Sequence, residues 1–241
     1  VLSQEATKDK TYVMRFLQEA HAAGQLSHKN LISAIDVGVS GGLYYFVMEF
    51  VTGKSCRDLM AKGVFTEKET LSIVSQTGEV LDHIHQHQMV HRDIKPENIL
   101  VTPEGQVKLC DLGLAKSTTS IEQSLTQDGL AVGTPYFMSP EQVRGDKDID
   151  IRADLYSLGA TMYYFLTGRR PFEGGSAAET MGMHLNAPVP DPRKQNPQIR
   201  EDLALVIQKL MLKDRLQRYQ TPAELIEDLR KIQSGAPPPH A

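Results

Sequence analysis

Apolar positions recur along this chain with two different spacings. Between residues 11 and 26 they recur every three or four positions, the spacing that predicts an amphipathic helix. Glu19 falls on the same face of that helix as the apolar residues, so its side chain is expected to point inward. Residues 31–39 and 43–51 are apolar, partly β-branched runs separated by Ser40-Gly41-Gly42. That pattern predicts a β-hairpin.

The next stretch predicts a long helix followed by short strands. Thr66 and Glu69 form a capping-box pair at the start of an apolar stripe, so a helix is expected over 66–88. Shorter elements are expected around it: a helix over 55–62 and two strands at 99–101 and 107–109. Residues 116–127 are rich in Ser, Thr and Gln without periodicity, which predicts an exposed loop.

The C-terminal part of the chain is predominantly helical in pattern. Helices are expected over 154–167, 176–185, 201–212 and 221–233. The first of these is apolar on nearly every face, which predicts burial all round. The proline-rich residues 235–241 are typical of the start of a linker.

Composition narrows the function classes. The chain has 241 residues, a net charge of −4 and no basic block, so nucleic acid is not an expected partner. No apolar run reaches the roughly 18–20 residues of a membrane helix, so no membrane contact is expected from this segment. Cys56 and Cys110 fit no metal or disulfide pattern, and free thiols in a reducing cytoplasm are the simplest interpretation.

The residues 91–98 carry the strongest chemical signal. Asp93, Lys95 and Asn98 place a proton acceptor, a cation and a metal-binding amide on one short loop. Phosphoryl transfer needs these three groups, to orient the attacking hydroxyl, to balance phosphate charge and to hold Mg²⁺. Asp111 follows 18 residues after Asp93 at the end of a short apolar run, where an Asp-x-Gly sequence taken alone usually marks a turn.

These motifs resemble those of the protein kinase family. His91-Arg92-Asp93 with Asn98 resembles the catalytic loop H-R-D-x-x-x-x-N, and Lys95 is the serine/threonine version of it. Asp111-Leu112-Gly113 resembles the metal-binding D-F-G, with Leu in place of Phe. The segment from Gly133-Thr134-Pro135-Tyr136 to Ser139-Pro140-Glu141 resembles the end of the activation segment. The chain as a whole looks most like a bacterial serine/threonine kinase.

The resemblance implies an α+β, two-lobed protein-kinase-like fold. Residues 1–51 would be the remnant of a small lobe with one helix and a β-hairpin, 52–234 a large helical lobe, and 235–241 the linker. The 241 residues contain no Gly-rich loop and no V-A-I-K-type Lys ahead of the first helix. The expectation is therefore that the first strands have been cut off before Val1, leaving a loose small lobe with weak ATP affinity.

The resemblance also implies roles for individual residues. Asp93 would accept the substrate proton, Lys95 would stabilise the transferred phosphate, and Asn98 and Asp111 would hold Mg²⁺, with ATP as the phosphate donor. Further residues would form the nucleotide site. Met48 would border the adenine pocket, Glu49 and Val51 would contact adenine through their backbone, and Leu100 would form the pocket floor. Glu19 would act indirectly, because it matches the helix glutamate that pairs with the missing Lys.

Regulatory and structural roles follow from the same resemblance. Arg92 indicates switching by phosphate on the loop that follows, with Thr126 favoured and Ser124 second, and Thr134 would bond Asp93 and Lys95. Two structural links are also expected: Glu141 would pair with Arg218, and Asp154 would bind the backbone of the catalytic loop.

The function predicted on this basis is a protein serine/threonine kinase acting on protein hydroxyls. A catalytically impaired pseudokinase or interaction scaffold is the rival, because the Gly-rich loop and its Lys are not in these residues. A small-molecule kinase is a weaker third hypothesis. His83 and His87, four apart on a helix, could form a metal ligand pair, but the end of a solvated helix is the preferred interpretation.

Overall fold

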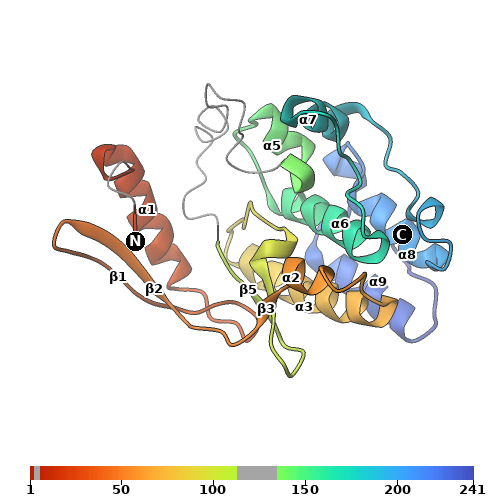
Figure 1. Ribbon diagram of the computed structural model, residues 1–241, viewed down its shortest axis with the longest axis horizontal. Coiled ribbons are helices and arrows are strands. Elements are labelled where there is room, and N and C mark those ends of the chain that lie inside the picture. The colour runs from red at the N-terminus through yellow and green to blue at the C-terminus, as the bar shows by residue number, and fades with distance from the viewer. Residues whose placement is uncertain (3–5, 113–134) are drawn as a thin grey trace.

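The elements of the protein fall into two groups that lie at opposite ends of the long axis (Figure 1). The computed structural model describes residues 1–2, 6–112 and 135–241, without the side chains of Arg15, Glu19 and Ala22. The helix and strands of the smaller group are α1 (Lys10–Ala23), β1 (Ala34–Ser40) and β2 (Leu43–Met48), preceded by the 3₁₀ turn η1 (Ala6–Lys8). The first helix therefore lies within one to three residues of its predicted ends.

The small group is a helix packed on a β-hairpin. β1 and β2 pair antiparallel with Val37 opposite Phe46, and a bulge interrupts the register between Ala34 and Asp36. Gly41 and Gly42 at the turn both have positive φ, +57° and +79°. Two such residues in a row suit a two-residue hairpin turn whose twist matches the strands, and glycine adopts it without steric cost. The predicted hairpin is confirmed, with shorter strands.

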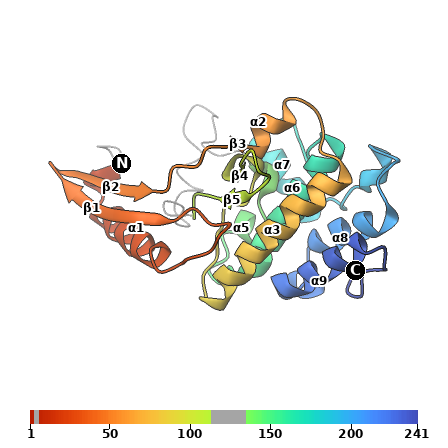
Figure 2. The same cartoon turned by 90° about the horizontal axis from the view of Figure 1, so that it is seen from below.

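The larger group is mainly helical with one small sheet (Figure 2). Its sheet is antiparallel in the order β3-β4-β5. Its strands and helices are β3 (Lys54–Ser55), α2 (Cys56–Met60), α3 (Glu67–Gln86), β4 (Ile99–Val101), β5 (Val107–Leu109), α5 (Pro140–Arg144), α6 (Ile151–Thr167), α7 (Ala177–Asn186), α8 (Glu201–Leu210) and α9 (Pro222–Gln233). Short 3₁₀ turns include η2 (Pro96–Asn98) and η3 (Pro135–Phe137).

The core of the larger group surrounds α6. Leu155, Leu158 and Phe165 of this helix are fully buried, as its apolar composition predicted. Burying each such side chain contributes about 1.5–3 kcal/mol. The helix begins three residues before its predicted start, because the side chain of Asp150 caps it by accepting a hydrogen bond from the Arg152 N–H. No helix among the described residues combines the length and the apolar character needed to cross a bilayer.

The capping box predicted for the long helix is present. Thr66 accepts a hydrogen bond from the Glu69 N–H, and the Glu69 carboxylate accepts one from the Thr66 N–H. These bonds satisfy two backbone donors that the first turn of a helix leaves unpaired. α3 therefore starts at Glu67 and runs to Gln86, where the chain turns toward the loop at 91–98.

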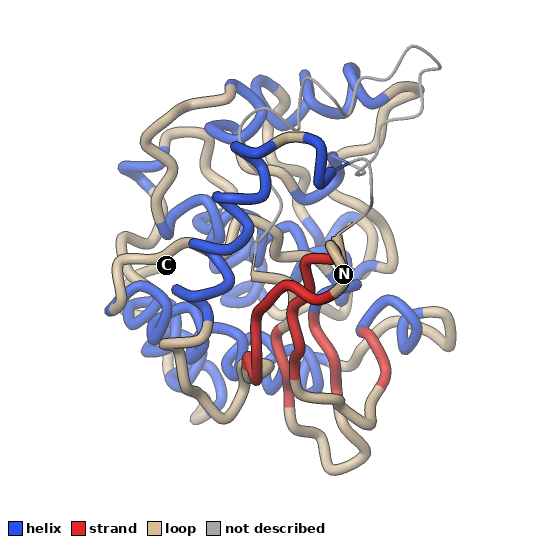
Figure 3. Tube along the Cα trace, turned by 90° about the vertical axis from the view of Figure 1, so that its left-hand side faces the viewer, coloured by secondary structure: helices blue, strands red, loops and turns tan. Residues whose placement is uncertain are grey.

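The two groups meet at β5, and this corrects two strand predictions. Residues 31–33 lie outside the hairpin: the Ile32 N–H donates to the Leu109 carbonyl at 2.9 Å, and the Leu109 N–H donates to the Asn30 carbonyl at 2.7 Å. The second strand ends at Met48, so 49–51 form a connection to β3. In Figure 3, which looks along the long axis, the hairpin β1-β2 lies in front of the strands of the other sheet. Alternation of apolar residues cannot distinguish pairing within a hairpin from pairing with a distant strand.

Candidate active site

The loop 91–98 is fixed from beneath by a buried carboxylate on α6. Asp154 Oδ2 accepts the His91 N–H and Asp154 Oδ1 accepts the Arg92 N–H, both at 2.7 Å. Burial raises the pKa of Asp154 to about 7, and this effect outweighs the two N–H donors, which lower the pKa. A buried carboxylate is costly unless it is hydrogen-bonded, and both of its oxygens are. The predicted link between Asp154 and this loop is confirmed.

Two side chains of the loop, Lys95 and Asn98, converge on the Asp93 carboxylate. Asp93 Oδ2 accepts hydrogen bonds from Lys95 Nζ at 2.8 Å and from Asn98 Nδ2 at 2.9 Å. Asn98 Nδ2 also donates to the Asp93 carbonyl at 2.8 Å. The amide nitrogen of Asn98 is thus committed to two acceptors, which fixes the orientation of the amide group and leaves its oxygen for another ligand. The structure brings together three of the four residues predicted to be catalytic.

Asp111 stands next to this cluster because the strand that precedes it is tied to the loop. The Cys110 N–H donates to the Asn98 carbonyl at 2.9 Å, and His91 Nε2 lies 3.0 Å from the Cys110 carbonyl. The Asp111 side chain itself is exposed. Asp111 and Arg92 have φ values of +58° and +66°. Non-glycine residues in this region are strained, and such strain concentrates at functional sites.

The donor set of Asn98 and Asp111 fits Mg²⁺. Both offer oxygen, the ligand that this ion prefers, and Mg²⁺ usually keeps water and phosphate oxygens in its remaining positions. The described residues contain no group of three or more His, Cys, Asp or Glu arranged to hold a metal. An ion at this site would therefore depend on oxygens from its nucleotide and from water.

The residues predicted to contact adenine lie where the small group joins the large one. Met48 ends β2, Glu49 and Val51 follow it, and Leu100 lies in β4. The Glu49 N–H donates to the Ser33 carbonyl at 2.9 Å, so only the Glu49 carbonyl remains for a ligand. The side chain of Glu49 pairs with Lys108 of β5 at 2.8 Å, and this hydrogen bond lowers the pKa of Glu49.

The segment after residue 134 is anchored to the same loop. Glu141 and Arg218 form a buried pair, with Oε1 to Nη1 at 2.7 Å and Oε2 to Nη2 at 2.9 Å, which confirms their predicted pairing. Gln142 Nε2 donates to the Arg92 carbonyl at 2.9 Å. Gln142 also closes a capping box with Ser139. Sequence reasoning missed Gln142, although the Ser-x-x-Gln spacing could have revealed it.

Several predicted residues lie outside the described part of the chain. The backbone of Glu19 belongs to α1, but its side chain is not described. Thr126, Ser124 and Thr134, predicted to be regulatory, lie within 113–134 and are not described either. Arg92, the fourth residue predicted to be regulatory, is half-buried in the loop beside Asp93.

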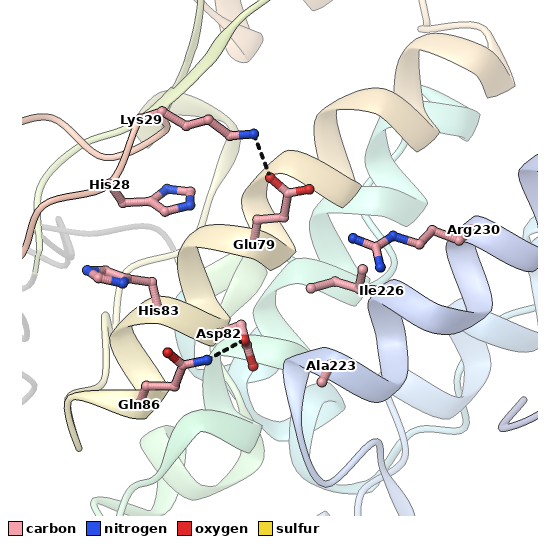
Figure 4. Close-up of a pocket in the computed structure, with 9 residues that line it drawn as sticks. All are labelled: His28, Lys29, Glu79, Asp82, His83, Gln86, Ala223, Ile226 and Arg230. Carbon is pink, nitrogen blue, oxygen red and sulfur yellow. Dashed lines mark hydrogen bonds and ion pairs between the residues drawn. The ribbon is translucent and has the colours of Figure 1, made fainter.

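His83 near the end of α3 and His28 before β1 line a polar cleft between α3, α9 and the residues before β1 (Figure 4). His28 and His83 are stacked with ring centroids 5.4 Å apart, and His83 lies 4.5 Å from His87. Burial is the main cause that lowers the pKa of both His28 and His83. Lys29 bridges to Glu79 across the cleft at 3.2 Å. His83, one of the two histidines considered above as a metal ligand pair, thus contacts both His28 and His87 through its ring.

The sequence was compared with known proteins and solved structures. It matches the family described as "Protein kinase domain" over residues 1–228. It is 36% identical to serine/threonine-protein kinase PknB of Mycobacterium tuberculosis over 99% of this chain and 39% of that protein. It is also 36% identical to serine/threonine-protein kinase PrkC of Bacillus subtilis, over 95% of this chain and 35% of that protein. The chain thus spans less than two fifths of the length of these relatives.

The fold was matched independently to solved structures. The crystal structure of the Mycobacterium tuberculosis PknI kinase domain superimposes with a TM-score of 0.75, at 24% sequence identity, over 96% of this chain and 83% of that one. At this level of identity the likeness establishes the fold. It confirms the predicted two-lobed α+β architecture with a mainly helical large lobe.

Proposed function

This chain belongs to the protein kinase family, and we propose that it transfers the γ-phosphoryl group of ATP to serine or threonine hydroxyls of protein substrates. One observation carries the proposal: Asp93, Lys95 and Asn98 are hydrogen-bonded into one cluster on a loop that Asp154 holds by its backbone. The relatives named above are serine/threonine-protein kinases, which supports the same substrate class.

The chemistry proposed for Asp93 is to orient the substrate hydroxyl and take its proton. Its Oδ2 is held by Lys95 and Asn98, so the carboxylate enters the reaction already positioned. Pre-positioning of this kind lowers the barrier by paying orientation costs before the reaction. Lys95 carries the positive charge that balances charge developing on the transferred group.

We assign Asn98 and Asp111 as the residues that hold Mg²⁺. Bound Mg²⁺ would neutralise the charge of the nucleotide phosphates. The adenine end would lie at the junction between the groups, with the Glu49 carbonyl and the Val51 backbone as hydrogen-bonding partners. Met48 and Leu100 would provide its apolar walls. Residues 1–51 and 52–234 would then form the small and large lobes, with a linker starting at 235.

We propose that phosphate on the segment after Asp111 regulates the site through Arg92. A phosphate adds about −1.5 to −2 charge and binds well to arginine. The Arg92 N–H donates to Asp154, and the Arg92 carbonyl accepts a hydrogen bond from Gln142. A phosphate bound by the Arg92 guanidinium would therefore act directly on the loop that carries Asp93. Thr126 is the favoured acceptor and Ser124 the second.

The regulatory proposal is tested with two variants of Thr126. Thr126→Glu is expected to be more active than Thr126→Ala on the same peptide. Equal activity of the two variants, and of wild-type protein before and after phosphatase treatment, would contradict it. The same pair of variants at Ser124 separates the two candidate positions.

The proposed activity is tested by Asp93→Asn, which preserves shape while removing the proton acceptor. Transfer of radiolabelled phosphate from ATP to a mixture of serine and threonine peptides should fall by roughly 10³-fold or more, since a positioned base and the electrostatics it organises are lost together. Asp82→Asn, on α3 in the cleft shown in Figure 4, is the matched control and should retain full activity. The scaffold hypothesis would be supported instead if the wild-type chain transferred no phosphate and the Asp93→Asn variant still bound the same partners.

The two cysteines bear on the cell compartment in which the protein acts. Cys56 and Cys110 are both free thiols. Free thiols and a supply of ATP are properties of the cytoplasm, so we place the activity there.

A further inference from the structure

Arg170 stacks on the ring of Tyr136, which belongs to the 3₁₀ turn η3. The guanidinium carbon of Arg170 is 3.4 Å from the centre of the Tyr136 ring. Tyr136 belongs to η3, and Arg170 follows the C-terminal cap of α6 at Gly168. A guanidinium that stacks on an aromatic face is held in one plane, so its edges point in fixed directions.

Most of the hydrogen-bonding capacity of Arg170 is unused. Its Nη1 donates to Glu173 Oε1 at 2.5 Å, while its Nε and Nη2 have no hydrogen-bond partner among the described residues. The Arg170 side chain is 35% exposed and that of Glu173 is 54% exposed. Ion pairs this exposed are weak and exchange readily with other carboxylates. Arg170 therefore presents an oriented donor edge to an incoming group.

This stacked pair is tied to the proposed active site through a short piece of chain. Phe137, next to Tyr136, packs edge-on against Tyr164 of α6, with ring centroids 6.1 Å apart. Gln142, six residues after Tyr136, donates to the Arg92 carbonyl. Since a fully extended chain covers at most ~3.5 Å per residue, Tyr136 lies within about 20 Å of that contact. An extended peptide of about six residues spans the same distance.

We propose that Arg170 is a specificity-determining residue that favours substrates with an acidic side chain near the phosphorylated serine or threonine. The inference rests on the proposed kinase activity and adds the substrate class to it. A guanidinium edge matches the two oxygens of a carboxylate, so Asp or Glu within six residues of the acceptor would bind it in the manner of Glu173. A lysine at the same substrate position would meet like charge.

The neighbouring arginine provides a matched control. Arg169 has the same charge and is exposed, and no aromatic ring among the described residues holds its guanidinium. Arg169→Ala and Arg170→Ala therefore change the net charge equally, but only the second removes the stacked donor edge. A general electrostatic effect on acidic peptides would appear in both variants.

The test is a peptide series in which Glu or Lys is placed in turn at each position from −6 to +6 around one serine, assayed with the full chain, ATP and Mg²⁺. Wild-type protein should favour Glu over Lys by about fivefold or more in kcat/KM at one position or more, mainly through KM. Arg170→Ala should abolish this ratio, Arg170→Glu should invert it, and Arg169→Ala should preserve it.

The outcomes separate this inference from the proposed function. If wild-type protein phosphorylates the peptides without preferring Glu, or if Arg170→Glu keeps the preference, the inference is wrong while the kinase activity stands. An equal loss of preference in Arg169→Ala and Arg170→Ala also overturns it. If no peptide is phosphorylated and no autophosphorylation occurs, the proposed function fails, and this inference fails with it.

Discussion

Replacing Glu141 by Gln tests how the segment that follows residue 134 is held in the large lobe. The variant keeps the shape of the side chain but removes the charge that faces Arg218, whose side chain is fully buried. Breaking a buried ion pair from one side costs about 3–5 kcal/mol, because the remaining charge has no counter-ion. Arg218 keeps carbonyl acceptors on Leu212, Arg152 and Lys213. We therefore expect a loss near the lower limit, about 3 kcal/mol.

Urea and thermal unfolding of purified protein measure this loss. For a chain of this size a loss of 1 kcal/mol lowers Tm by about 2–4 °C, so Glu141→Gln should unfold roughly 6–12 °C below wild type. Asp146→Asn is the control, since the Arg144–Asp146 pair is also at hydrogen-bonding distance but is 49% and 32% exposed. Its expected loss is below about 1 kcal/mol.

A double variant isolates the pair from the rest of its surroundings. Glu141→Leu with Arg218→Met replaces both charges by apolar groups, and the loss should be smaller than the sum of the two single losses by about 2–3 kcal/mol. The reasoning is refuted if Glu141→Gln is as stable as Asp146→Asn. Strict additivity in the double variant would also show that the two residues act independently.

Four further predictions follow from other contacts. Asp154→Asn can no longer accept both loop N–H groups, so kcat/KM should fall by about 10²-fold, the effect of a displacement of about 1 Å at the reacting groups. Because burial raises the pKa of Asp154 to about 7, the folded state keeps a proton that the unfolded state releases near pH 4. The stability of wild type relative to Asp154→Asn should thus decline between about pH 4 and pH 7, by up to ~4 kcal/mol, and a constant difference across a pH series of urea titrations would disprove it. Thr66→Ala should cost about 1 kcal/mol in unfolding free energy through loss of the capping box. Burial, with the charges of Asp111 and Asp93, raises the pKa of Cys110 to about 12. Iodoacetamide at pH 8 should therefore alkylate Cys110 at least about a hundredfold more slowly in folded than in urea-unfolded protein, as mass spectrometry would measure.

Local signals predicted much of this structure. The capping box of Thr66 and Glu69 and the apolar faces of α6 depend on residues within one or two turns, so spacing alone reveals them. The spacing of Asp93, Lys95 and Asn98 works in the same way, since all three lie on one loop. Family resemblance was needed to assign the partners of Asp154 and Glu141, which lie more than 60 residues away.

Other features could not be read from the sequence. Residues 31–33 have the composition of a hairpin strand, but their partner is Leu109, and no local pattern carries that information. The stacking of Arg170 on Tyr136 depends on how the end of α6 meets η3, which tertiary packing determines. The positive φ of Asp111 lies next to Cys110, whose N–H donates to the Asn98 carbonyl, and no local sequence pattern indicates that long-range contact.

The junction at β5 has a mechanical consequence. The two segments that connect the small group to the large one both contact this three-residue strand. The residues before β1 form hydrogen bonds with the backbone of Leu109, and Glu49 pairs with the side chain of Lys108. Asp111 lies two residues after the end of this strand. A displacement of β5 would therefore be passed on to Asp111 through one intervening residue, Cys110. We expect a change in the angle between the two groups to shift the position of that carboxylate.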